Sequence, residues 1–130
     1  MRRTSVLLGL SGLLALTLAG CGDDGPAVDA PVSSTIEVLG TDSLDFEPDE
    51  FAVPAGEEVT VELTSEPTVE HDFVIEDVDG QDLMVVHADP GETATGTFTI
   101  EAAGTYTFFC SIPGHREAGM EGPLEVVEEG

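Results

Sequence analysis

Three side chains that bind metals lie close together near the carboxyl end of the sequence. Cys110, His115 and Met120 follow one another at intervals of five residues and offer a thiol, an imidazole and a thioether. A thiolate combined with imidazoles and a weak thioether is the ligand set that selects copper in trigonal electron-transfer sites. Such a site needs a second imidazole from elsewhere in the chain.

His71 is the candidate for this second imidazole. It begins the segment His-Asp-Phe-Val-Ile-Glu, which has the composition of a strand. Side chains alternate along a strand with period two, so His71 shares a face with Phe73 and Ile75, which is the core face. A lone inward histidine is more often a satisfied core residue, but three further donors in one loop favour a ligand. His87, followed by Ala-Asp-Pro, is the weaker candidate.

The remaining sequence predicts short strands and turns with no sustained helical period. Residues 58–63 alternate clearly and place Val59, Val61 and Leu63 inward. Met84 lies between Leu83 and Val85, and we expect its side chain in the core. About seven or eight strands, with Gly and Pro in the turns, predict an all-β antiparallel sandwich. The length suits one domain, which we place at residues 32–130.

The first 20 residues are typical of an export signal. Two arginines precede an apolar run that is shorter than the roughly 20 residues of a membrane span. Leu-Ala-Gly-Cys at 18–21 resembles the lipobox of prokaryotic lipoproteins, which implies a lipid on Cys21 after cleavage; a plain secretory cleavage site is the alternative. Either Sec or twin-arginine export fits. Residues 21–31 are acidic and rich in Gly and Pro, and predict a flexible linker. With Cys21 lipidated, we expect no disulfide to Cys110.

The charge of the chain is strongly one-sided. Cleavage after residue 20 would keep all 27 acidic residues and Arg116 as the sole arginine, and the sequence contains no lysine. Phosphate binding needs clustered basic residues, so nucleic acid is excluded as a partner. Such charge keeps a protein hydrated and soluble at the cost of self-repulsion, which favours a salt-rich habitat. A protein partner is expected to present a basic or apolar face.

The domain resembles the cupredoxin family of small blue copper proteins. The resemblance covers roughly residues 32–130 and follows the order of strands, turns and ligands. It implies a Greek-key β-sandwich that binds one copper ion through His71, Cys110, His115 and Met120. The matching motifs are Phe46-x-Pro48, Val53-x-Ala55-Gly56, Glu70-His71-Asp72-Phe73, Pro90-Gly91-Glu92, Gly104-Thr105-Tyr106 and Cys110-x4-His115-x4-Met120.

The resemblance also implies roles for residues around the ligands. Many family members carry Asn after the strand histidine, where its amide ties the ligand loop to the strand. This chain has Asp72 instead, and Ser111 is a candidate donor to it. The outer edge of His115 is expected to serve as the electron port within an apolar patch. The patch consists of Ile112, Pro113, His115, Ala118, Gly119 and Pro123.

These residues predict an electron carrier that uses copper as Cu(I) and Cu(II), and not an enzyme. A structural zinc site would rarely include a thioether, and a Cys–His nucleophilic pair needs a third orienting group. A metal-free binding module would make four ligands coincidental. Copper storage or delivery to an oxidase remains the main alternative. We expect a monomer, lipid-anchored at the extracytoplasmic face of the cell membrane and exchanging electrons with redox proteins.

Overall fold

The computed structural model of the protein describes residues 28–129, which form nine strands. Within this range no helix has the length and hydropathy that a membrane span requires. The expected signal segment and Cys21 lie outside the described residues. The strands are β1 (Thr35–Gly40), β2 (Phe46–Glu47), β3 (Phe51–Pro54), β4 (Val59–Ser65), β5 (His71–Val78), β6 (Gln81–Ala88), β7 (Thr93–Phe98), β8 (Gly104–Phe109) and β9 (Glu121–Val127).

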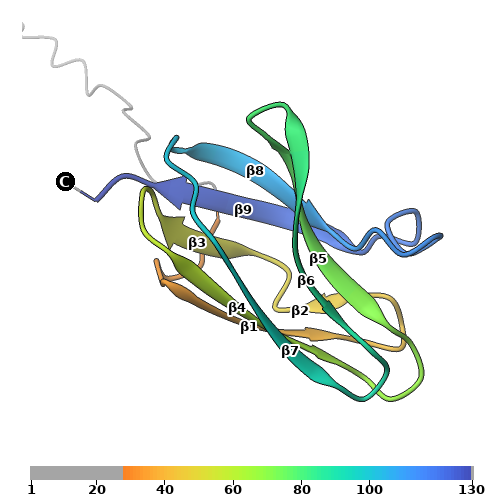
Figure 1. The fold of residues 1–130 in the computed structure, drawn as a ribbon. Helices are drawn as coiled ribbons and strands as arrows, with labels where there is room; N and C mark the ends of the chain where they lie inside the picture. Colours follow the sequence, from red (N-terminus) through yellow and green to blue (C-terminus); the bar gives the residue numbers. More distant parts are fainter. Residues whose placement is uncertain (1–27, 130) are drawn as a thin grey trace, which may run out of the picture.

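The strands form two sheets that pack face to face (Figure 1). One sheet has the order β2-β1-β4-β7, and the other has the order β3-β9-β8-β5-β6. The predicted all-β sandwich is therefore confirmed, with nine strands among the described residues in place of seven or eight.

The prediction of purely antiparallel pairing is wrong at two places. β1 pairs in parallel with β4, and β3 pairs in parallel with β9. Parallel neighbours need a crossover connection, and here the chain passes through β3 in the other sheet before it returns as β4. The alternation of apolar residues fixes which face of a strand is buried, but it carries no information on the direction of the neighbouring strand.

Aromatic rings fill the space between the sheets. The rings of Phe73 and Phe108 stack with centroids 4.8 Å apart and an interplanar angle of 9°. Phe46 and Phe51 each contact both of these rings at tilted angles. The predicted inward residues Val59, Val61 and Leu63 are fully buried. This core fixes the strands whose ends carry the candidate ligands.

Met84 lies on the surface, with 53% of its area exposed, so its predicted place in the core is wrong. It belongs to β6, which is an edge strand. The register between β5 and β6 shifts after Phe73, so that Phe73 faces Val86 but Val74 faces Met84. Such a bulge reverses the alternation of faces, and the side chains of Leu83 and Val85 turn partly inward instead.

The segment predicted as the end of the linker contacts the domain. Val28 is buried, and Val32 forms a parallel bridge with Ala52. Residues 29–31 lie beside the start of β1, around Thr35. The opposite end of β1, at Gly40, contacts His71. The chain therefore enters the described domain at the end that lies away from the candidate ligands.

Candidate metal centre

The four predicted ligands belong to the start of β5, the end of β8, the start of β9 and the loop between β8 and β9. This loop lies at one end of the sandwich, on the right in Figure 1. His71 is the first residue of β5, Cys110 follows the last residue of β8, and Met120 precedes the first residue of β9. His115 lies in the loop between Cys110 and Met120. All four side chains are buried, and His71, Cys110 and Met120 have no exposed area. Strand ends therefore hold three of the four donors.

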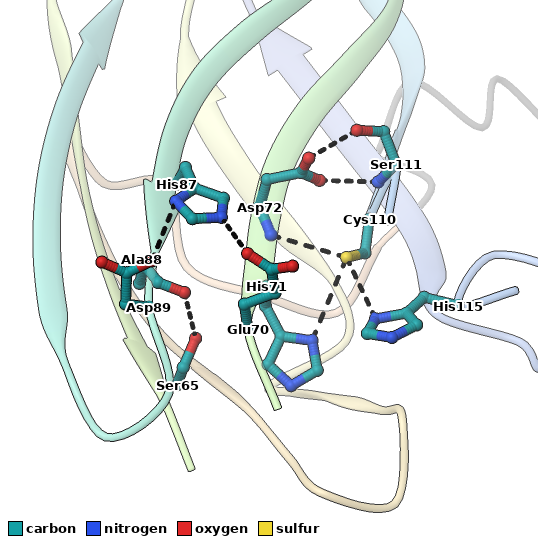
Figure 2. Close-up of polar contacts among 10 residues, drawn as sticks. All are labelled: Ser65, Glu70, His71, Asp72, His87, Ala88, Asp89, Cys110, Ser111 and His115. Atoms are coloured by element: carbon teal, nitrogen blue, oxygen red, sulfur yellow. Dashed lines mark hydrogen bonds and ion pairs between the residues drawn. The ribbon is translucent and has the colours of Figure 1, made fainter. Parts of the chain in front are cut away.

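Sulfur and nitrogen donor atoms face one another in this buried site (Figure 2). The Sγ atom of Cys110 lies 3.4 Å from Nδ1 of His115 and 3.9 Å from Nδ1 of His71. The two imidazole rings have centroids 5.1 Å apart and are tilted by 58°. The three donor atoms all lie within 4.8 Å of one another. The strand-alternation argument for an inward His71 is confirmed.

Backbone hydrogen bonds close the ligand loop. The amide of Cys110 donates to the carbonyl of Met120 at 3.1 Å, and the amide of Met120 donates to the carbonyl of His115 at 3.1 Å. The amide of His115 donates to the carbonyl of Ile112. Backbone hydrogen bonds of the chain itself therefore hold the three ligand residues of the loop in one compact turn.

Burial sets the protonation states of the metal-free donors. It raises the pKa of the Cys110 thiol to about 11, so the free thiol keeps its proton at neutral pH. Burial also lowers the pKa of His71, and the nearby His115 lowers it further, so the ring is neutral. A neutral imidazole is ready to bind a metal, whereas the thiol must first release its proton.

The residues around His71 hold its ring in one position. A Cβ atom on Gly40 would lie 2.5 Å from Cδ2 of His71, so only glycine leaves room for the ring. Nε2 of His71 is buried without a well-aligned hydrogen-bond partner among the described residues. The nearby backbone of Thr41 raises the pKa of His71, but the opposing effect of burial is larger. The Nδ1 atom points at Cys110 instead. With the thioether of Met120, this donor set fits one copper ion.

Asp72 ties the strand to the ligand loop, as the resemblance led us to expect of this position. Its side chain is buried, and Oδ1 accepts a hydrogen bond from the amide of Ser111 at 2.6 Å. Oδ2 accepts a second, short hydrogen bond from the Ser111 hydroxyl. The amide of Asp72 donates to Sγ of Cys110 at 3.5 Å. A carboxylate thus fulfils the tie as an acceptor, where Asn would also donate.

Arg116 holds the outer side of the loop, a role that was not predicted from the sequence. Its guanidinium donates to Glu121 at 2.7 Å and pairs with Glu76 of β5 at 2.9 Å. It also lies over the ring of Phe109, 4.1 Å from the centroid. The signal in the sequence was its position: one arginine, within an otherwise acidic domain, beside a candidate ligand.

His115 and the residues of the predicted apolar patch differ in exposure. This histidine is 7% exposed. Pro113, Ala118, Gly119 and Pro123 are exposed, whereas Ile112 is partly buried against the core. Ile112, Pro113, Ala118 and Gly119 belong to the loop that carries His115, whereas Pro123 lies on β9. His115 alone among the predicted ligands retains exposed area.

Comparison with known proteins agrees with the geometry. Two buried imidazoles, a thiol and a thioether at one end of a β-sandwich define a type 1 copper protein. Residues 32–127 match the family model of copper-binding proteins of the plastocyanin/azurin family. The chain belongs to this family and is a cupredoxin.

Individual relatives cover most of the domain. The chain is 32% identical over 117 residues to the copper-resistant cuproprotein CopI of Rubrivivax gelatinosus, covering 78% of this chain and 71% of that protein. It is 36% identical over 102 residues to plastocyanin of Sambucus nigra, covering 70% and 99%. The structure of reduced auracyanin from Roseiflexus castenholzii aligns with a TM-score of 0.61 and 31% identity, covering 75% and 99%.

The carboxylate of Asp72 gives a first prediction. Replacing it in Asp72→Asn keeps the shape and removes one negative charge beside Cys110, so the reduced state of bound copper gains relative stability. The reduction potential, measured by protein-film voltammetry, is expected to rise. Asp79→Asn removes an exposed charge from the turn between β5 and β6, at the opposite end of β5 from His71, and serves as the control. Equal potentials in Asp72→Asn and the wild type would show that the side-chain charge is without influence.

The close approach of Gly40 and His71 gives a second prediction. Gly40→Ala forces the imidazole or the strand to move, at a cost of about 1–3 kcal/mol in the free energy of unfolding. We expect weaker copper retention and an altered visible spectrum, measured by chelator competition and absorbance on folded protein. Ser43→Ala, in the exposed loop that follows, should match the wild type in both. Unchanged copper retention in Gly40→Ala would contradict the steric argument.

Proposed function

We propose that the protein carries single electrons and does not transform a substrate. When bound by these donors, copper supplies a one-electron change between Cu(I) and Cu(II). The observation that supports a carrier is that the chain holds His71, Cys110 and His115 in contact through its own packing and hydrogen bonds. Four protein donors enclose the position between them, and this arrangement favours electron exchange over substrate binding.

Rigidity of the donors is what a carrier needs most. Gly40 fits against the ring of His71, and the Asp72–Ser111 hydrogen bonds fix Cys110 through its neighbour. Arg116 fixes the far side of the loop through two carboxylates. Side chains held in this way change little between oxidation states, which keeps the barrier to electron transfer low.

His115 is the proposed electron port. His115 alone among the ligands keeps some exposed area, and its loop also carries exposed Pro113, Ala118 and Gly119 and the half-buried Ile112. With Pro123 of β9, these residues are the proposed patch around the port. A partner that covers this patch excludes water and brings its own redox group close to the imidazole. The patch is small, which suits the brief contacts of a carrier.

The position of the tether favours a membrane-anchored carrier. We propose cleavage after residue 20 and a lipid on Cys21, which lies outside the described residues. Residues 29–31 lie beside the start of β1, and the ligand pocket lies at the other end of that strand, beside Gly40. A tether attached there leaves the His115 patch facing away from the extracytoplasmic membrane surface and open to redox partners.

The acidic surface selects the partner. With 27 acidic residues in the chain, a monomer of this protein repels copies of itself and attracts a basic docking face. In the salt-rich setting that we propose, the screening length falls to about 3 Å at roughly 1 M ionic strength. The apolar patch around His115 then contributes most of the recognition.

Copper storage or delivery is the second candidate, because one relative carries the name copper-resistant cuproprotein. Carriers that hand over copper tend to display several exchangeable methionines or histidines. Among the described residues Met84 is exposed and Met120 is fully buried. One exposed thioether and one exposed imidazole, that of His87, are fewer than such carriers display, so the ligand inventory of the described residues favours electron transfer.

A copper-loading experiment distinguishes electron transfer from copper delivery. We expect an intense blue colour with one equivalent of Cu(II), rapid reversible reduction measured by stopped-flow absorbance, and slow loss of copper to an apo acceptor. Fast transfer of copper to that acceptor, with slow electron exchange, would establish delivery instead. A colourless protein at full copper occupancy would exclude the blue site itself.

The port is tested by a matched pair of charge substitutions. Ala118→Glu places a carboxylate in the His115 patch, and Ala103→Glu places one at the exposed opposite end of β8. We expect Ala118→Glu to slow electron exchange with an uncharged redox partner about tenfold, which corresponds to about 1.4 kcal/mol, and Ala103→Glu to leave it unchanged. The blue absorbance should be the same in both. Equal rates would place the port elsewhere.

A further inference from the structure

A second group of metal-binding side chains lies on the surface near the copper site. Nε2 of His87 lies 2.8 Å from Oε2 of Glu70, and Nδ1 of His87 lies 3.9 Å from Oδ1 of Asp89 (Figure 2). Donor atoms from the three residues all lie within 4.8 Å of one another. The ligands of the copper site do not account for this group.

Pairing between β5 and β6 fixes the backbone of these residues. His71 faces Ala88 and Asp72 faces His87 in the antiparallel register. Glu70 directly precedes β5 and Asp89 directly follows β6, so the two residues lie opposite each other. The carbonyl of Ala88 also accepts a buried hydrogen bond from the hydroxyl of Ser65 at 2.9 Å. The three side chains therefore project from an anchored strand end.

The side chains themselves are free to adjust. The exposed fractions are 42% for His87, 47% for Glu70 and 73% for Asp89. A cation takes only one of the two ring nitrogens of His87, so the carboxylates of Glu70 and Asp89 must turn toward the same nitrogen. Exposed side chains change rotamer at little cost, which brings metal–ligand distances of about 2.0–2.2 Å within reach. Water completes the coordination at an exposed position.

The chemistry of the group selects the cation. One imidazole with two carboxylates suits Zn²⁺ and Cu²⁺, whereas Mg²⁺ and Ca²⁺ prefer oxygen ligands throughout. The surrounding chain is acidic and has Arg116 as its sole Lys or Arg among residues 28–129, so it attracts cations to this face. Arg116 pairs with Glu76 and Glu121 and does not compete for this group.

We propose that Glu70, His87 and Asp89 form a second metal site that binds a divalent cation of the Zn²⁺ or Cu²⁺ type. Glu70 is the residue directly before the copper ligand His71. A cation bound there places positive charge near the copper, which favours the reduced state and raises the reduction potential. The second site thereby links the availability of external cations to the potential of the carrier.

Zinc titration of the copper-loaded protein tests this proposal. We expect isothermal calorimetry to show one further equivalent of Zn²⁺ bound, with the blue absorbance retained and with excess Mg²⁺ present. In the reduced protein, the imidazole nitrogen resonances of His87 should shift on zinc addition, while those of His71 and His115 stay in place. His87→Gln and Glu70→Gln should each weaken zinc binding at least tenfold.

Glu92→Gln is the matched control, because it removes one exposed carboxylate from the same turn but outside the group. It should bind zinc like the wild type. Equal zinc binding by His87→Gln and the wild type would overturn the proposal, and so would zinc uptake that merely displaces copper. Voltammetry provides the second readout: zinc should raise the copper potential in the wild type and not in His87→Gln. A wild-type potential that zinc leaves unchanged would overturn the link to the copper centre.

Discussion

The structure depends on burying a thiol and two imidazoles against one another at the end of an apolar sandwich. Buried polar groups cost free energy unless other groups satisfy them, and here Sγ of Cys110 lies within 4 Å of both Nδ1 atoms. The stacked rings of Phe73 and Phe108 lie on the same two strands, β5 and β8, that bear His71 and lead to Cys110. Core packing therefore determines the distance between the donors.

The surface of the molecule and the ligand pocket differ in charge and in exposure to solvent. The surface is acidic and governed by screening, while the pocket is shielded from solvent and holds one carboxylate, Asp72, satisfied by two bonds from Ser111. Arg116 connects the two regions, because it binds surface carboxylates and covers the ring of Phe109 beside the pocket. The single arginine of the described domain thus stabilises the loop that carries His115.

Both proposals concern the same strand end. His71 belongs to the buried copper site, whereas its neighbour Glu70 belongs to the proposed surface site with His87. Alternation along a strand sends successive side chains to opposite faces, so adjacent residues belong to the copper site and to the proposed cation site. A cation at the proposed site would therefore be close enough to the copper for its charge to influence the reduction potential.

The sequence alone determined the donors and the fold class, because ligand types and strand alternation are local properties of the chain. The spacing of Cys110, His115 and Met120 and the parity of His71 with Phe73 were sufficient to predict one buried site. The apolar neighbours of Met84 led to a wrong prediction, because a bulge in the pairing with β5 turns Leu83 and Val85, and not Met84, toward the core.

Only the tertiary structure decided which distant residues meet. The fit of Gly40 against His71, the Arg116 contacts and the Glu70–His87 pair depend on how β1, β5, β6 and the ligand loop are placed beside one another. Strand direction was likewise undetermined, since parallel and antiparallel neighbours bury the same alternating residues. The sequence specifies which side chains turn inward, and long-range packing specifies what they contact.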